Sequence, residues 1–195
     1  MIRALYANLK RPPRTAMEWI TDAVRAAAIL GVLTAAVTFP ATDTAVLSMT
    51  LPAVMLTRML GLRAGLDLAI CLTVIVAAGS NVVDLYRAWA GWDLVVHAVC
   101  TGVLAAVALV ILDDAAVIAP TGRRRTPIVV ATLTGLALSA VWEMVEWFGY
   151  RFITDAVCVT YDDTIGDMMA GGLGALIAGV LASRFRLTRQ DRAPV

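Results

Sequence analysis

The sequence is poor in the residues on which many soluble domains and metal sites depend. Charged residues make up 16% of the 195 positions, and there is one histidine. The three cysteines are an odd number without metal-ligand spacing, which argues against a cysteine-based metal site. Basic and aromatic side chains do not interleave on one surface, which argues against nucleic acid as a partner. What remains is a chain that is 60% hydrophobic with a mean hydropathy of +0.80, a composition typical of membrane proteins.

Long apolar segments account for most of the chain. Six of them approach the roughly 20 residues that an α-helix needs to cross a bilayer. The sequence therefore predicts an all-α, polytopic membrane protein with six transmembrane helices. We expect a basic arm at 1–17, a single transmembrane domain at 18–183 and a basic tail at 184–195. The predicted spans are 18–39, 44–60, 66–84, 93–112, 127–148 and 164–183.

Prolines are expected to shape three of these elements. Pro12-Pro13 should break any helix in the amino-terminal arm, and Pro52 should kink or tilt the short second span. Thr126 and Pro127 suit the N-cap and the first turn of the fifth span.

Basic residues concentrate on one side of the predicted membrane. Only Arg87 and Arg151 fall in loops on the other side. Because basic loops stay in the cytoplasm, both termini are predicted to be cytoplasmic, in a bacterial plasma (inner) membrane. The basic residues on the cytoplasmic side are Arg3, Lys10, Arg11, Arg14, Arg58, Arg63, Arg123, Arg124, Arg125, Arg184, Arg186, Arg189 and Arg192.

This orientation places the apolar loop of residues 149–163 outside the cell. A loop of this length and apolarity is predicted to fold back over the end of the bundle. Its Cys158 should face the outside, whereas Cys71 and Cys100 should be buried in helices. Charges inside the first span, Asp22 and Arg25 together with Glu18, are interpreted as an ion pair within that helix.

Two glutamates interrupt the apolar segment of residues 139–150. Glu143 and Glu146 are three residues apart and therefore lie on nearly the same helical face. A carboxylate in the centre of a bilayer costs roughly 2.5–3.5 kcal/mol on insertion scales. Neither residue is placed to cap a helix, so at least one is expected to belong to a site or to be protonated.

The predicted topology brings further polar residues to the same depth in the outer leaflet. His97 and Asp167 each lie about one turn inside a span. We favour a functional role for His97 over a packing role, because several carboxylates share its depth. The candidate catalytic residues are His97, Glu143 and Glu146, and the candidate metal ligands are Asp93, His97, Glu143, Glu146, Asp163 and Asp167.

The aspartates among these candidates also have a structural interpretation. Asp93 suits the N-cap of the fourth span, which we favour over metal ligation. Asp163 can cap the sixth span, or Thr164 can do so in a capping box with Asp167. For Asp167, capping and a site role both remain open.

Small residues recur at every fourth position in the fourth and sixth spans. Such stripes allow close backbone approach in lipid, and they predict a tight core of the fourth, fifth and sixth spans. The stripes are Ala98, Gly102 and Ala106 in the fourth span, and Gly171, Ala175 and Gly179 with Ala170, Gly174 and Ala178 in the sixth.

Three motifs in residues 80–183 carry a resemblance to a known family. They are DLVVH at 93–97, AVWEMVEW at 140–147, and DTIGDM at 163–168 with glycines after it. In this order they resemble the YjdF-type family of bacterial inner-membrane proteins and, more distantly, VanZ-like proteins. The resemblance implies a multi-pass membrane protein. It implies no defined activity for the first family and an association with teicoplanin resistance for the second.

The sequence leaves two functions open, and in both the protein has the lipid bilayer as a partner. In the first, which we favour slightly, the polar cluster binds a lipid-linked ligand or orders the bundle. In the second, the protein is a metal-assisted or acid–base enzyme that acts on a lipid-linked substrate in the outer leaflet. A divalent metal ion is the candidate cofactor, and the lack of a second histidine argues against zinc.

Overall fold

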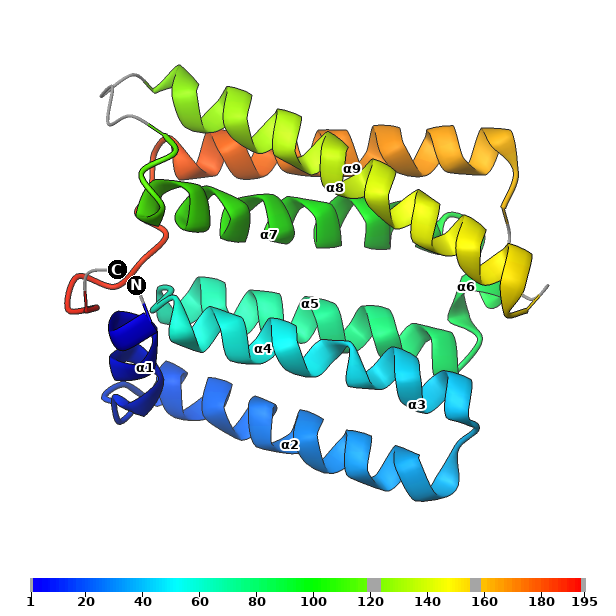
Figure 1. The fold of residues 1–195 in the computed structure, drawn as a ribbon, viewed down its shortest axis with the longest axis horizontal. Coiled ribbons are helices and arrows are strands. Elements are labelled where there is room, and N and C mark those ends of the chain that lie inside the picture. Colours follow the sequence, from blue (N-terminus) through cyan, green and yellow to red (C-terminus); the bar gives the residue numbers. More distant parts are fainter. Residues whose placement is uncertain (1, 119–123, 155–158, 194–195) are drawn as a thin grey trace. The chain divides into compact units, whose positions relative to one another are not determined.

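The chain is helical through most of the part that the computed structural model describes, which is residues 2–118, 124–154 and 159–193. Within these ranges there is no β-strand, only one isolated bridge between Leu62 and Thr188. The all-α prediction is confirmed. The helices are α1 (Ile2–Lys10), α2 (Ala16–Thr38), α3 (Ala41–Ser48), α4 (Thr50–Met59), α5 (Ala64–Val82), α6 (Leu85–Ala88), α7 (Trp92–Asp114), α8 (Arg125–Phe152) and α9 (Tyr161–Ala182) (Figure 1).

Five of the described helices, α2, α5, α7, α8 and α9, are long and apolar enough to cross a membrane. The second predicted span is instead divided between α3 and α4, which meet at Met49. Pro52 lies in the first turn of α4, where it cannot donate a hydrogen bond to the carbonyl of Ser48 and its ring crowds that carbonyl. The interruption is one residue long: Met49 keeps a helical backbone conformation, and its N–H bonds to Ala45 O at 3.2 Å. It is therefore compatible with the kink that the proline predicted.

Of the two further predictions about prolines and helix ends, one is confirmed and one is wrong. The arm contains a helix, α1, which ends at Lys10, and α2 begins only at Ala16, so Pro12-Pro13 break the helix in the arm as predicted. The N-cap of α8 is Arg124, so Thr126 does not cap this helix. Pro127 lies in the first turn of α8, as predicted.

The connection between α8 and α9 is shorter than the sequence predicted. Because α8 continues to Phe152 and α9 begins at Tyr161, only residues 153–160 connect them. Cys158 lies outside the described residues, so its predicted exposure and the predicted fold-back of the loop stay predictions.

The chain divides into two compact units. The first comprises Met1–Ala90, Asp114–Val117 and Arg186–Val195, and it contains α1 to α6. The second comprises Gly91–Asp113 and Ile118–Phe185, and it contains almost all of α7 together with α8 and α9. The single transmembrane domain stays a prediction.

A buried arginine connects three helices of the first unit. From α2, Arg25 donates hydrogen bonds to Val54 O at 2.8 Å and Thr57 Oγ1 at 3.1 Å, both in α4, and to the carboxylate of Asp67 in α5. It also donates to Asp22 at 2.8 Å, so the predicted pair within α2 is present. This pair is one part of a larger buried network, and Cys71 is buried in the same region.

Glu18 makes no direct ion pair with Arg25 among the contacts of the described residues, contrary to the prediction. Among these contacts it is linked to Asp22 only through Arg11 and Arg58. Its carboxylate accepts hydrogen bonds from Arg11 Nη1 at 3.0 Å and from the backbone N–H of Arg14 at 2.6 Å. The hydroxyl of Thr15 caps α2 by accepting from the Glu18 N–H at 3.2 Å. Thr15 is thus the N-cap of α2, and the Glu18 carboxylate bonds to the residue before the cap, so α2 starts earlier than the hydrophobic segment alone indicates.

Both ends of the chain meet the α4–α5 connection at one end of the first unit. The Arg189 N–H donates to Gly61 O and the Arg63 N–H to Leu187 O, each at 2.9 Å. Ala193 N donates to Asn8 Oδ1 at 3.0 Å. The amino-terminal arm and the carboxyl-terminal tail therefore lie side by side.

Small residues bring the helices of the second unit close together, as their spacing predicts. A Cβ on Gly174 of α9 would overlap the carbonyl of Ala98 in α7. A Cβ on Gly102 would lie 2.9 Å from Gly174 O, and one on Gly171 would lie 2.7 Å from Ser139 Oγ in α8. Polar side chains near these crossings are therefore forced into proximity.

Candidate metal centre

His97 lies at the centre of a polar cluster in the second unit. It belongs to α7 and is 6% exposed. Its Nε2 lies 3.4 Å from Asp93 Oδ1, one helical turn away, and 3.9 Å from Asp167 Oδ2 of α9. Its Nδ1 lies 3.7 Å from Glu143 Oε1 of α8. Each imidazole nitrogen therefore faces its own carboxylate partners.

The two glutamates of α8 occupy different environments. Glu143 is buried beside His97, whereas Glu146 is half-buried. Glu146 Oε1 accepts a hydrogen bond from Trp142 Nε1 at 2.7 Å. One oxygen of Glu146 is thus already engaged by protein, and Glu143 is the glutamate more closely tied to the histidine.

The start of α9 shows that Asp167 is not a capping residue. The N-cap is Thr160, whose hydroxyl accepts a hydrogen bond from the Asp163 N–H at 3.3 Å. Asp167 therefore lies in the second turn, where it is 1% exposed. Both capping alternatives predicted for this helix, Asp163 and Thr164, are wrong.

Asp93 is not a capping residue either. Because α7 begins at Trp92, Asp93 is the second residue of the helix, with its side chain directed along the helix toward His97. Its side chain is 37% exposed, which makes it the most accessible member of the cluster around the histidine. The N-cap interpretation that the sequence favoured is wrong.

Three buried oxygens at this site have no hydrogen-bond partner among the residues that the structure describes. They are Glu143 Oε1, Asp167 Oδ2 and Ser139 Oγ. Buried polar atoms in folded proteins nearly always have partners, and an unpartnered carboxylate oxygen is especially costly. The arrangement therefore points to a further group that these oxygens contact.

The cluster contains two sets of three residues that could hold a metal ion, and within each set the donor atoms all lie within 4.8 Å of one another. One set is Asp93, His97 and Asp167, and the other is His97, Glu143 and Glu146. Carboxylate oxygens with one imidazole suit a hard or borderline divalent cation. Five of the six candidate ligands are thus brought together, while Asp163 belongs to neither of the sets found among the described residues.

Sequence reasoning missed Ser139, although a signal was present. Ser139 lies four residues before Glu143, so the two share a helical face. It also missed Asp67 in the first unit, an acidic residue in the first turn of an apolar helix, whose partner Arg25 lies on another helix.

Comparison with known protein families gives one result that decides the membership of this chain. Residues 16–188 match the family described as "Predicted membrane protein (DUF2238)". The chain belongs to this family. The match covers all five helices of spanning length, so this family member is a multi-pass membrane protein in a lipid bilayer. No curated protein and no solved structure matches the chain.

Proposed function

We propose that this membrane protein binds a divalent cation through His97 and its carboxylate neighbours and uses it in acid–base chemistry on a lipid-linked substrate. The observation that carries the proposal is the pair of unpartnered, buried oxygens, Glu143 Oε1 and Asp167 Oδ2, on either side of His97. A network that only orders helices is expected to satisfy its own polar atoms. Four carboxyl groups around one imidazole also repel one another unless a cation or protons neutralise them.

The Nε2 side of His97 fits the cation best. There Asp93 and Asp167 supply oxygen ligands, and the exposure of Asp93 leaves a position open to a substrate. On the other side, Glu143 is placed to accept a hydrogen bond from Nδ1–H, as a carboxylate does behind many metal-bound histidines. Glu146 is the less suitable ligand, because Trp142 already occupies one of its oxygens.

Glu143 and Glu146 then have separate roles in this account. Glu143 is a positioning residue that fixes the tautomer and the orientation of His97. Glu146, half-buried and close to the metal ligands, is the candidate general base. The cation would supply charge stabilisation for an anionic group of the substrate.

The surroundings of the site support a lipid-linked substrate. Next to the cluster, α7 and α8 expose apolar side chains, among them Leu94, Trp142 and Trp147. In a multi-pass membrane protein such surfaces contact lipid, and tryptophans favour the interface between lipid and water. A substrate with a polar head and a lipid tail would place its head at Asp93 and its tail along these helices.

We also propose six membrane crossings, with both termini in the cytoplasm of a bacterium and the cluster near the extracytoplasmic face. The contact between the amino-terminal arm and the carboxyl-terminal tail supports an even number of crossings. The divided pair α3–α4 would then supply the sixth crossing. The order of the three motifs further supports placing this chain among YjdF-type proteins of the inner membrane, with VanZ-like proteins as distant relatives.

Binding of Mn²⁺ to the full chain in uncharged detergent tests the metal site. We expect Asp167→Asn to weaken binding by at least about tenfold, because it removes a ligand. Glu146→Gln should change the affinity much less. Asp162→Asn is the matched control, since it makes the same charge change in the exposed first turn of α9. Wild-type affinity in Asp167→Asn would refute the site.

A second experiment separates catalysis from binding alone. The purified chain is reconstituted into vesicles of total bacterial lipid with Mn²⁺, and the lipids are followed by mass spectrometry. The enzyme proposal predicts that one lipid species is consumed by the wild type and retained with EDTA or with Asp167→Asn. An unchanged lipid profile from metal-loaded protein would contradict the enzyme and favour a binding or bundle-ordering role.

A further inference from the structure

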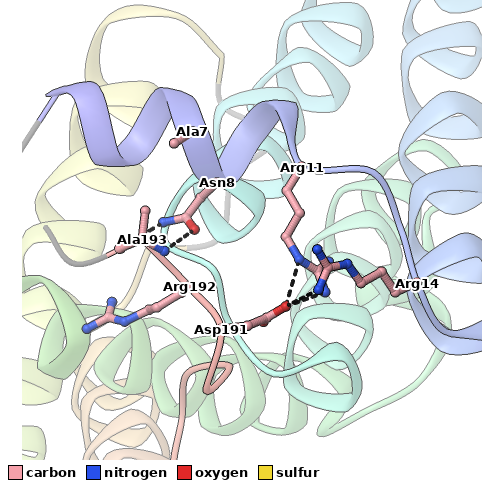
Figure 2. A pocket seen from close by; sticks show the side chains of 7 residues that line it. All are labelled: Ala7, Asn8, Arg11, Arg14, Asp191, Arg192 and Ala193. Atoms are coloured by element: carbon pink, nitrogen blue, oxygen red, sulfur yellow. Dashed lines mark hydrogen bonds and ion pairs between the residues drawn. The ribbon is translucent and has the colours of Figure 1, made fainter.

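The arm and the tail line an open pocket of about 310 Å³ within the first unit (Figure 2). The arm supplies α1 and the arginines that follow it, and the tail supplies residues 191–193. Asn8 holds the two segments together through hydrogen bonds with both backbone groups of Ala193, at 3.0 and 3.4 Å. The polar residues that line the pocket are Asn8, Arg11, Arg14, Asp191 and Arg192.

The pocket carries more positive than negative charge. Asp191 Oδ2 accepts hydrogen bonds from Arg11 Nε at 3.1 Å, Arg11 Nη2 at 2.9 Å and Arg14 Nη1 at 3.2 Å. Asp191 thus contacts two guanidinium groups, and Arg11 is shared between Asp191 and Glu18, to which its Nη1 donates at 3.0 Å. Arg192 is neutralised separately, by two hydrogen bonds to Asp114 at 2.9 and 2.6 Å.

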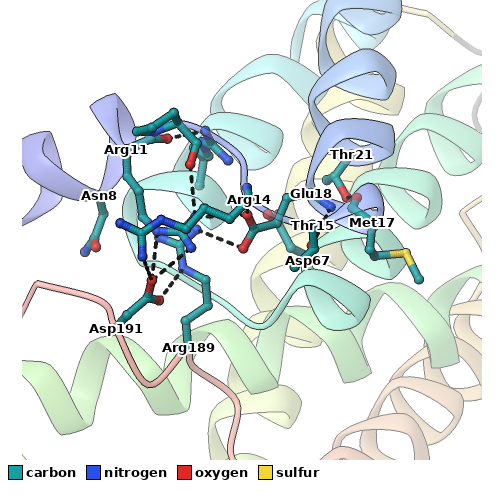
Figure 3. A network of polar contacts seen from close by, with 12 residues as sticks. Asn8, Arg11, Arg14, Thr15, Met17, Glu18, Thr21, Asp67, Arg189 and Asp191 are labelled. Atoms are coloured by element: carbon teal, nitrogen blue, oxygen red, sulfur yellow. Dashed lines mark hydrogen bonds and ion pairs between the residues drawn. The ribbon is translucent and has the colours of Figure 1, made fainter.

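A third cation, Arg189, lies directly beside Asp191 (Figure 3). Its side chain is 8% exposed, and its Nε and Nη2 atoms have no hydrogen-bond partner among the residues that the structure describes. The nearest acidic oxygens, on Glu18 and Asp191, are both 3.9 Å away. Burial and then the charge of Arg11 lower the pKa of Arg189 below its usual value. The cluster therefore holds a buried cation with unused donors.

The position of the pocket relative to the bilayer follows from its neighbours. Arg14 precedes α2, the first helix of spanning length, by two residues. Trp19 in the first turn of α2 is 63% exposed, and Ile2 and Tyr6 of α1 are also exposed. Exposed apolar and aromatic side chains beside basic residues are typical of the membrane interface.

We propose that this arm–tail pocket binds a phosphate group at the bilayer surface, carried either by an anionic phospholipid headgroup or by soluble phosphate. Guanidinium forks match the oxygens of phosphate, and an anion here would meet the exposed guanidinium of Arg14. Arg189 does not line the pocket but lies buried behind Asp191, so its unused donors become available to an anion that displaces the Asp191 carboxylate. Asp191 occupies part of this position and competes with the phosphate for Arg11 and Arg14. This site does not depend on the metal centre.

Because Asp191 competes with the phosphate, the proposal predicts opposite changes in phosphate affinity for variants of the arginines and of Asp191. The full chain in uncharged detergent is titrated, at constant ionic strength, with radiolabelled inorganic phosphate and separately with fluorescent phosphatidylglycerol or phosphatidylcholine. Arg14→Gln and Arg189→Gln should each weaken binding by about tenfold, the loss expected for a charge-assisted hydrogen bond. Asp191→Asn should strengthen it. Arg3→Gln, an exposed position on α1 outside the pocket, removes the same charge as a control.

The two titrations also identify the source of the phosphate group. Saturable binding of phosphatidylglycerol in preference to phosphatidylcholine identifies a lipid headgroup, and saturable binding of inorganic phosphate identifies a soluble ligand. If Arg189→Gln fails to fold, the opposite effects of Arg14→Gln and Asp191→Asn still decide the proposal. It is overturned if neither probe binds, or if these variants bind as Arg3→Gln does.

Discussion

Arg25 of α2 and Asp67 of α5 form an ion pair in which both side chains are almost fully buried. Arg25 lies in a helix that is long and apolar enough to cross a membrane. A charge in such a position is tolerated when it is paired and when its remaining N–H groups have acceptors. Val54 and Thr57 of α4 provide those acceptors, so one arginine holds three helices of the first unit together.

Removing one partner of this pair should destabilise the protein strongly. We expect Asp67→Ala to cost about 3–5 kcal/mol, because it leaves Arg25 buried without its main counter-ion. Thermal unfolding in detergent measures the effect. Asp84→Asn is the control, since Asp84 and Arg87 form an exposed pair whose loss should cost no more than about 1 kcal/mol. Adding Arg25→Leu to an Asp67→Leu variant should restore part of the loss, and strictly additive losses would contradict the account.

The stability of the close packing between α7 and α9 should be sensitive to the addition of a single methyl group. Gly174→Ala places a Cβ where the Ala98 carbonyl lies, so the helices must separate, and we expect a cost of about 1–3 kcal/mol or more. Mn²⁺ binding should weaken with it, since His97 and Asp167 lie on these two helices. Gly166→Ala in α9 is the control, because its Cβ would meet only Leu94 Cδ2 at 3.4 Å. Equal melting temperatures for the two variants would show that the close approach is absent.

Topology can be tested through cysteines on the two predicted sides of the membrane. A membrane-impermeant maleimide should label Cys158 in intact cells, whereas Cys71 should stay unlabelled because it is buried. In a Cys158→Ser background, Gln190→Cys in the tail should react only after lysis. The reverse pattern would invert the orientation and place the metal centre near the cytoplasmic face.

The contact between arm and tail should loosen in acid. Hydrogen bonding by Arg11 lowers the pKa of Asp191 below its usual value of 3.8. A lowered pKa in the folded state means that the contact stabilises the protein fully above about pH 4 and is lost as the pH falls through the folded value. Because Asp191 is 42% exposed, the effect should be at most about 1 kcal/mol.

Hydrogen-exchange protection of the α1 amides, compared at pH 6 and pH 3, measures this loosening. Asp191→Asn should reduce protection at pH 6 and remove the difference between the two pH values. A wild-type arm that is equally protected at both pH values would argue against the contact.

Much of the second unit could be predicted from the sequence because its signals are local and periodic. The depth of His97, Glu143 and Asp167 follows from counting residues along apolar helices, and the small-residue stripes indicate which helices approach closely. The capping assignments failed at Asp93 and Asp167 for a local reason. The helices begin one to three residues earlier than the hydrophobic segments do, and the N-cap of α9 is Thr160, whose hydroxyl accepts from the Asp163 N–H.

The first unit was harder to predict, because its polar contacts join residues far apart in the chain. Nothing local to Asp67 indicates that Arg25 reaches it from another helix. The tail arginines raise a similar difficulty. Counting basic residues uses Arg189 and Arg192 only as markers of the cytoplasmic side. It gives no indication that Arg192 binds Asp114 or that Arg189 is buried near Glu18.

The metal content of the purified full chain tests the central claim most directly. The protein is isolated in detergent without chelator or added metal, and its metals are measured by mass spectrometry alongside His97→Ala. The account predicts about one divalent ion per wild-type chain, consistent with one set of ligands around His97 Nε2, and loss of that ion from the variant. It further predicts that Mn²⁺ added to a metal-stripped sample restores the ion in the wild type alone. A folded wild-type protein that carries no ion and takes up none would contradict it.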